Sequence, residues 1–473
     1  MNYKINWPDR TQKYLEIEVS FENIKSTKQE IQLPAWRPGR YELQNFAQYI
    51  RKVRAFDANR QEIPISKINK DRWQIESQGH SACSVRYEFY ADMQNAGGSF
   101  VDSGFFYLNP VNCCMYIDEK VNEACSLTVD FTANRQIASG MAHQKSGSLS
   151  TFKAKNFHDL VDSPIMISDQ IQHKTYNIGK HDFHVWIKGK VEIDWDRLLD
   201  DFKKFTQVQI ELFQEFPEPE YHFMLWMLPH SFYHGVEHRN STMMTLGPDG
   251  QDFDQFYTDL LCLASHELFH TWNVKKIRPI ELLPYDYSKE NYFETCFVAE
   301  GLTTLYGDWI LHRAGVLSRD QFIKEFGTTI KRHFEGADEA SESLASSSYD
   351  LWLDGYKKSV PNRTASVYNK GALAGLILHS LILEQSQGEK GLDQVMQTLW
   401  ARFGKPFVGY SSQDYIALCE EVANTPLDTY FQDIIYGNKS IWDETQKALS
   451  HWNLEVQKNE EGHVVLVDLE ARK

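Results

Sequence analysis

The hydrophobic pattern of the chain changes near residue 172, and this change limits the folds that are possible. Before it, apolar and polar residues alternate in short runs such as 14–21 and 85–90, which predicts β-strands with one buried face. Turn residues, for example the RPGR segment at 37–40, separate these runs. After residue 172, apolar residues recur mainly at helical spacing. The sequence therefore predicts an α+β multidomain protein with an N-terminal β-sandwich.

The region after residue 172 combines two apolar strands with long helices. We expect strands at 183–187 and 221–228, and helices at 194–216, 253–273, 292–315 and 364–385. Residues 386–473 are expected to be mainly helical, with a short strand at 463–467. These patterns predict three domains, with boundaries at 1–172, 173–385 and 386–473.

Composition excludes several classes of protein. The formal net charge is −16, from 65 acidic and 49 basic residues, which disfavours nucleic acids and anionic membranes as partners. No run approaches the roughly 20 apolar residues of a membrane span, and the N-terminus lacks the apolar core of a secretory signal. The seven cysteines are scattered without a C-x-x-C pair, which favours reduced thiols. We therefore expect a cytoplasmic protein with no nucleic-acid or membrane partner.

A histidine pair in the predicted helix at 253–273 indicates metal chemistry. His266 and His270 are four residues apart, so on a helix both imidazoles lie on one face and can reach one metal ion. Glu267 is displaced by about 100° around the axis, which suits a general base for a metal-activated water. The H-E-x-x-H pattern also occurs by chance, but a buried histidine pair without a partner would be costly on an apolar helix.

A catalytic zinc ion needs a third protein ligand. Glu300 is the best candidate, because it lies in the apolar segment FVAEGL, where an unpaired carboxylate would be expensive to bury. Glu290 and Glu294 are rivals in more polar surroundings. Four further histidines have no ligand spacing on a helix, and most are interpreted as surface or supporting residues: His222, His230, His234 and His238.

Two weaker motifs each permit two interpretations. Glu237 follows Gly235 after the strand at 221–228, and it is either an anchor for a peptide's α-ammonium or an exposed acidic loop residue. Tyr368 opens the helix that runs to residue 385. Its phenol either donates a hydrogen bond to a tetrahedral oxyanion or caps and packs the helix. The residues alone leave both questions open.

Taken together, these motifs resemble those of the glycyl aminopeptidase family of zinc metallopeptidases, which are gluzincins related to thermolysin-like and aminopeptidase N-like enzymes. The matching segments follow the family order along nearly the whole chain: 34–41, 160–164, 235–241, 266–279, 299–308 and 368–371. The resemblance implies a thermolysin-like catalytic domain at 173–385 and one Zn²⁺ per chain. That ion would be held by His266, His270 and Glu300, with Glu267 as catalytic base.

The resemblance also assigns roles in the two weaker motifs. It implies that Glu237, with Gly235, holds the substrate N-terminus and that Tyr368 stabilises the oxyanion. We therefore expect a zinc aminopeptidase that acts on peptides, with small first residues such as Gly or Ala suggested by the family name. The alternatives are a zinc endopeptidase and a peptide-binding protein with a vestigial site.

Family members commonly have a PDZ domain near the C-terminus. The chain stops at Lys473, soon after the segment at 448–454, so no PDZ domain is expected in residues 386–473. The sequence does not predict an oligomeric state.

Overall fold

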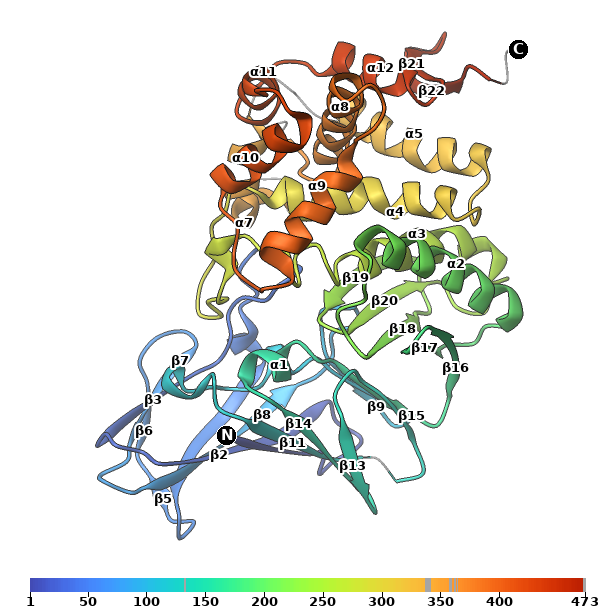
Figure 1. The fold of residues 1–473 in the computed structure, drawn as a ribbon. Helices are drawn as coiled ribbons and strands as arrows, with labels where there is room; N and C mark the ends of the chain where they lie inside the picture. Colours follow the sequence, from blue (N-terminus) through green and yellow to red (C-terminus); the bar gives the residue numbers. More distant parts are fainter. Residues whose placement is uncertain (132, 337–341, 357–359, 361–362, 364, 471–473) are drawn as a thin grey trace. The chain divides into compact units, whose positions relative to one another are not determined.

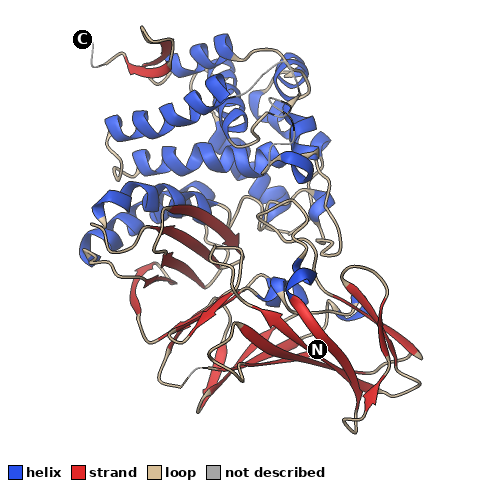
Figure 2. Cartoon of the chain, turned by 180° about the vertical axis from the view of Figure 1, so that it is seen from behind, coloured by secondary structure: helices blue, strands red, loops and turns tan. Residues whose placement is uncertain are grey.

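The structure, a computed structural model, describes the chain except residues 132, 337–341, 357–359, 361, 362, 364 and 471–473 (Figure 1). The chain forms two compact units. Unit 1 comprises Met1–Ile193, Glu218–Phe256 and Tyr287–Lys289, and unit 2 comprises Asp194–Pro217, Tyr257–Asp286 and Glu290–Lys473. The strands lie mainly in unit 1 and the helices mainly in unit 2 (Figure 2). The predicted domain boundaries at 172 and 385 stay a prediction.

Unit 1 contains two sheets built from its first part. The larger sheet has the strand order β13 (His143–Ser146), β14 (Leu149–Ala154), β11 (Cys125–Asp130), β1 (Asn2–Asn6), β2 (Tyr14–Glu22), β8 (Ala82–Tyr90), β4 (Ile50–Asp57), β5 (Glu62–Ile63). The smaller sheet has the order β3 (Lys28–Gln32), β7 (Arg72–Glu76), β6 (Ile65–Lys67).

The alternating sequence pattern explains the larger sheet. Along β2 and β8 every second residue is buried, as the period of two requires. The two strands are antiparallel, and the buried residues Leu15 and Phe89 face each other across the pair, as do Val19 and Val85. Each cross-strand pair buries apolar surface on the same face, so a slip by one residue would expose the whole set. The prediction of a sheet-rich N-terminal region in an α+β protein is confirmed.

Two further sheets of unit 1 share an apolar core. One has the order β12 (Gln136–Ala138), β15 (Ile165–Ser168), β10 (Phe105–Leu108), β9 (Phe100–Asp102). The other has the order β16 (Ile171–Ile178), β17 (His181–Lys188), β18 (Glu220–Met227), β20 (Ser241–Gly247), β19 (Phe232–His238). Between them Trp226 packs its ring 4.9 Å from that of Phe105, centroid to centroid. This aromatic burial fixes the five-stranded sheet within unit 1.

Unit 2 is built from helices. Its longer α-helices are α2 (Trp195–Phe213), α3 (Asp254–Phe269, from Tyr257 on), α4 (Leu302–Arg313), α5 (Arg319–Gly336), α8 (Asn369–Gln385) and α10 (Ser412–Ala423). Shorter ones are α6 (Leu344–Tyr349), α7 (Leu351–Asp354), α9 (Leu392–Leu399), α11 (Asp428–Tyr430) and α12 (Trp442–Ser450). Helices α4, α5 and α8 lie side by side (Figure 1). None of the helices in the described part of the chain is both long and apolar enough to cross a bilayer.

The helix boundaries differ from the predicted ones by a few residues. Helix α2 begins where predicted, because the side chain of Asp194 accepts a hydrogen bond from the backbone N–H of Arg197. It ends at Phe213 rather than 216, because Gln214 takes a left-handed conformation. The helix predicted at 364–385 begins at Asn369 within the described residues, and its expected first residue, 364, lies outside them.

Two elements depart from the predicted pattern more clearly. The helix predicted at 292–315 begins five residues later, as the π-helix η5 (Phe297–Gly301) that continues into α4. The C-terminal strand β22 (Val464–Asp468) forms as expected, but it pairs with β21 (Leu454–Lys458), which was not predicted. An isolated strand has no hydrogen-bond partners, so the observed hairpin is the simplest way to satisfy its backbone.

Candidate metal centre

Helix α3 and the residue that follows it bring two imidazoles together. The backbone N–H of His270 donates to the carbonyl of His266 at 3.3 Å, which continues the last turn of the helix. The Nε2 atoms of the two rings are 3.1 Å apart. Glu267 lies between them in sequence and is 4% exposed. The predicted convergence of His266 and His270 on one face is therefore present in the structure.

The predicted third ligand lies in the π-helix η5. Glu300 is 3% exposed, and its Oε2 is 3.4 Å from Nε2 of His270 and 3.8 Å from Nε2 of His266. A π-helix has wider turns than an α-helix; it is rare in proteins but frequent at functional sites. Here the π-helix contains Glu300, the residue that faces the histidine pair. The rival Glu294 is exposed and precedes the π-helix.

Two glycines allow η5 to meet the start of α8. A Cβ on Gly301 would lie 2.6 Å from Cα of Gly371, and one on Gly371 would lie 2.9 Å from Cα of Gly301. Only residues without side chains permit such a backbone approach. Tyr368, at the N-terminus of α8, is thereby close enough to Glu300 to be affected by its charge. Burial and then this negative charge raise the pKa of Tyr368 well above its usual value, so the phenol keeps its proton.

Charge and burial compete at Glu300. Burial by itself opposes ionisation of this carboxyl. The charge of His270 and the hydrogen bonds from His266 and His270 outweigh burial and hold the pKa of Glu300 far below its usual range. Glu300 is thus an anion at neutral pH, as a metal ligand must be.

Asn273 links the two parts of the centre and was not identified from the sequence. Its backbone carbonyl lies 2.9 Å from Nδ1 of His270. A carbonyl can only accept, so Nδ1 carries a ring proton in either charge state, and Nε2 is the nitrogen that would bind a metal ion after losing its own proton. The side-chain amide of Asn273 donates to the carbonyls of Val298 and Ala299 in η5, at 2.8 and 3.1 Å. A polar asparagine between Trp272 and Val274, three residues after the second histidine, was the available signal in the sequence.

Glu237 and Gly235 belong to unit 1 and are described there. Both lie on β19, where Glu237 faces Thr242 of β20. Glu237 is 3% exposed, so the interpretation as an exposed loop residue is wrong. Its Oε1 accepts no hydrogen bond from any described residue. Gly39 approaches so closely that any Cβ there would collide with Oε2 of Glu237, and its φ of +73° also favours glycine.

The residues of the centre fit a zinc ion. Two imidazole nitrogens and one carboxylate are the donor set of many catalytic zinc sites, which keep a fourth position open. Ligand atoms about 2 Å from one tetrahedral ion are about 3.3 Å apart, close to the 3.1 Å between the two Nε2 atoms. The backbone carbonyl at Nδ1 of His270 is the usual second partner of a metal-binding histidine.

The fold and this centre define a metallopeptidase, and comparison with known proteins identifies its family. Residues 2–169 match the model of the peptidase M61 N-terminal domain, and residues 259–374 match that of the M61 glycyl aminopeptidase. The two models describe one family and together match more than half of the chain. The chain belongs to the M61 glycyl aminopeptidase family. The prediction of this family is confirmed.

Solved structures agree with this assignment. The chain is 28% identical to an aminopeptidase N family protein from Idiomarina loihiensis, with a TM-score of 0.89 over 97% of this chain and 79% of the other. It is 13% identical to an M1 zinc metallopeptidase from Deinococcus radiodurans, solved also as a mutant bound to a Tyr-Ser-Ala substrate, with a TM-score of 0.54 over 93% of this chain and 94% of the other. The second likeness concerns the fold alone. No curated protein matches the chain.

Proposed function

We propose that this metallopeptidase is a zinc aminopeptidase that removes the first residue of peptides and binds one Zn²⁺ per chain. The observation that supports the proposal is the convergence of His266, His270 and Glu300 beside the buried Glu267. The similar Deinococcus protein is a zinc metallopeptidase with a bound tripeptide substrate, which agrees with peptides as the substrate class.

In the proposed mechanism, zinc supplies Lewis-acid activation of a water molecule when it is bound. Glu267 accepts a proton from that water and later returns it to the leaving amine. The phenol of Tyr368, which keeps its proton, donates a hydrogen bond to the oxyanion that develops on the scissile carbonyl. Asn273 holds Nδ1 of His270 protonated, so this imidazole cannot turn its N–H toward the metal position.

Glu237 is proposed to bind the α-ammonium of the substrate. Its carboxylate is buried, and Oε1 has no hydrogen-bond donor among the described residues, so a charged N–H would satisfy it. Gly235 lies two positions earlier on the same face of β19 and adds no side chain there. A preference for small first residues such as Gly or Ala agrees with the family name.

The test is hydrolysis of a panel of aminoacyl-arylamides, each free and N-acetylated, by wild type and Glu267→Gln. We expect activity on free-amine substrates only, lost by chelation and restored by Zn²⁺. In Glu267→Gln, kcat should fall by about 10²- to 10⁴-fold while zinc stays bound. Full activity in this variant would overturn the role of Glu267. Equal rates on acetylated peptides would instead favour an endopeptidase.

Glu237→Gln tests the ammonium anchor separately. Loss of a charge-assisted hydrogen bond should raise KM for free-amine substrates by about 10- to 100-fold. The rate on N-acetylated substrates, which present no ammonium, should be the same as in wild type. An unchanged KM for free amines would remove Glu237 from the binding site without affecting the assignment of the metal ligands.

A further inference from the structure

A second group of two histidines and one glutamate lies on the five-stranded sheet of unit 1. His184 of β17 and His222 of β18 are direct neighbours across a parallel strand pair. Their rings stack with centroids 4.4 Å apart and an angle of 4° between planes. Glu220 precedes His222 by two residues, so its side chain leaves the same face of β18. Three possible ligands thus project from two adjacent strands.

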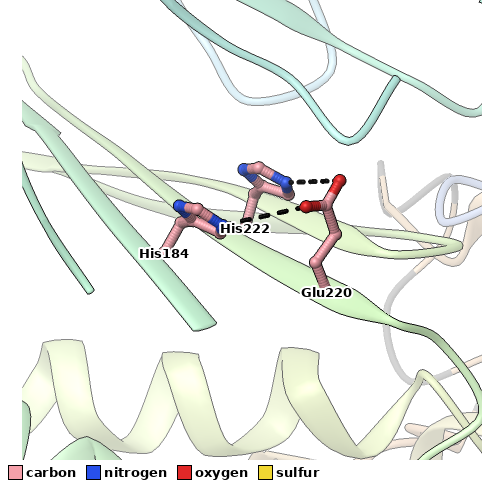
Figure 3. Close-up of side chains that lie close together, drawn as sticks. All are labelled: His184, Glu220 and His222. Carbon is pink, nitrogen blue, oxygen red and sulfur yellow. Dashed lines mark ion pairs between the residues drawn. The ribbon is translucent and has the colours of Figure 1, made fainter. Parts of the chain in front are cut away.

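Their ligand atoms converge. Oε1 of Glu220 is 3.5 Å from Nε2 of His222, and Oε2 is 3.8 Å from Nε2 of His184. One nitrogen from each ring and one carboxylate oxygen all lie within 4.8 Å of one another. Figure 3 shows both imidazoles directed toward the carboxylate of Glu220. Because the rings are stacked, their in-plane lone pairs run in parallel planes, so the two imidazoles must tilt toward each other to bind one ion.

Burial makes the arrangement unusual for a simple ion pair. The side chain of His222 is 6% exposed, and its Nε2 makes no hydrogen bond within the described part of the chain. Its nearest ionic partner is the carboxylate of Glu220 at 3.5 Å, a long contact that a metal ion held between the two atoms would replace. The side chain of Glu220 is 41% exposed, so the cluster is open to an ion from solvent.

Neighbouring rings orient His184. Nε2 of His173 on β16 is 3.1 Å from Nδ1 of His184, so one of these nitrogens donates to the other. If His184 donates, its Nε2 lone pair faces Glu220, as coordination requires. His173 is in turn held by Trp186, whose ring stacks on it at 3.4 Å.

We propose that His184, His222 and Glu220 form a second binding site for a divalent transition-metal ion such as Zn²⁺, separate from the peptidase centre. Two imidazoles and a carboxylate suit zinc better than calcium or magnesium, which prefer oxygen ligands. The site goes beyond the proposed peptidase function and does not depend on it.

Binding at this site requires a proton to move. Trp186 donates its indole N–H to Nδ1 of His222 at 3.1 Å, so the neutral ring carries its own proton on Nε2. Coordination through Nε2 moves that proton to Nδ1 by way of solvent, and the hydrogen bond from Trp186 is lost. The ring remains neutral, and no proton is released from it overall. The site therefore binds zinc less tightly than it would without this indole.

The experiment measures Zn²⁺ bound per chain by equilibrium dialysis of the full-length protein. We expect two equivalents in wild type and one in the double variant His184→Ala/His222→Ala. The matched control, His143→Ala, changes an exposed histidine of β13 and should keep two. A His266→Ala/His270→Ala variant should retain the second equivalent whether or not the peptidase proposal holds.

Two results would overturn the proposal: no bound zinc in a folded His266→Ala/His270→Ala protein, or as many equivalents in a folded His184→Ala/His222→Ala protein as in wild type. Trp186→Phe gives a test without loss of a ligand. Because it removes the competing N–H, it should tighten binding of the second equivalent by roughly two- to tenfold. Unchanged or weaker binding in a folded Trp186→Phe protein would mean that Nε2 of His222 is not a ligand.

Discussion

The molecule contains two clusters of the same composition, two histidines and a glutamate, on different secondary structure. The helix cluster, His266–His270–Glu300, places its histidines one turn apart and adds Glu267 beside them. The strand cluster, His184–His222–Glu220, takes its histidines from adjacent strands. Its nearest ionisable neighbours include a third histidine, His173. The helix cluster thus has the buried carboxylate of Glu267 beside it, whereas the strand cluster has the imidazole of His173.

The two clusters also differ in the group that faces Nδ1 of a histidine ring. Nδ1 of His270 faces a backbone carbonyl, which leaves Nε2 ready to coordinate. Nδ1 of His222 faces an indole N–H, which leaves the proton on Nε2. The comparison teaches that equal ligand types do not make equal sites. The polarity of the atom behind each ring decides how much it costs to bind an ion.

The largest expected effect separates the clusters by function. Glu300→Gln should lower kcat/KM for peptide substrates by about a thousandfold or more, because a neutral amide is a poor zinc ligand and several kcal/mol of transition-state stabilisation are lost. Glu220→Gln makes the same chemical change in the strand cluster and should leave kcat/KM near wild type. Steady-state kinetics of the two variants check this. Comparable losses in both would end the functional distinction.

A smaller effect concerns the groups that orient the helix cluster. Asn273→Ala removes the amide that bonds the carbonyls of Val298 and Ala299, so the π-helix that presents Glu300 loses its support. We expect zinc affinity to fall by about 10- to 100-fold, measured by competition with a chelator.

Asn291→Ala is the matched control for that experiment. Asn291 is also a buried asparagine, and its amide donates to the backbone carbonyl of Asp286 at 2.8 Å. Its loss should lower stability but not zinc affinity. Equal weakening of zinc binding in the two variants would show that Asn273 acts only through general stability.

The smallest effect concerns protons at the strand cluster. Burial, then the neighbouring His184 and His222, lower the pKa of His173 to about 4. In the unfolded chain the pKa of this histidine is higher, about 6.5, so the unfolded chain takes up the proton first as pH falls. The free energy of unfolding therefore decreases between about pH 6.5 and pH 4. The contribution is about 1 kcal/mol after allowance for solvent screening.

Urea unfolding of His173→Gln and wild type at pH 7.5 and pH 4.5 measures this contribution. The variant should lose less stability on acidification than wild type does. His143→Gln, at an exposed position, should keep the wild-type difference. A His173→Gln protein with an undiminished loss would mean that this ring is protonated equally in the folded and unfolded chains.

Much of the fold and of the helix cluster could be predicted from local patterns. The alternation in β2 and the cap at Asp194 are properties of neighbouring residues, and both elements form as expected. The apolar segment around Glu300 indicated a carboxylate that needs a partner, and the structure brings it to the histidine pair. The roles of these residues as zinc ligands stay a prediction until metal binding is measured.

Other features could not be read from the sequence. His222 was interpreted as a surface or supporting residue, because no helical spacing connects it to another ligand. Its neighbour His184 is 38 residues earlier, and only the register of β17 on β18 brings the two rings together. A glutamate two residues before a histidine on a strand was the one local signal for this cluster.

The sequence by itself determined the α+β class and the pairing of His266 with His270 on one helix face, because periodicity governs contacts within one element. The tertiary structure alone decided the π-helix at Glu300, the Asn273 link and the strand cluster. These depend on strand register, on backbone contact between Gly301 and Gly371, and on hydrogen bonds between distant segments. Such contacts are set by packing of the whole unit, so the local order of residues does not encode them.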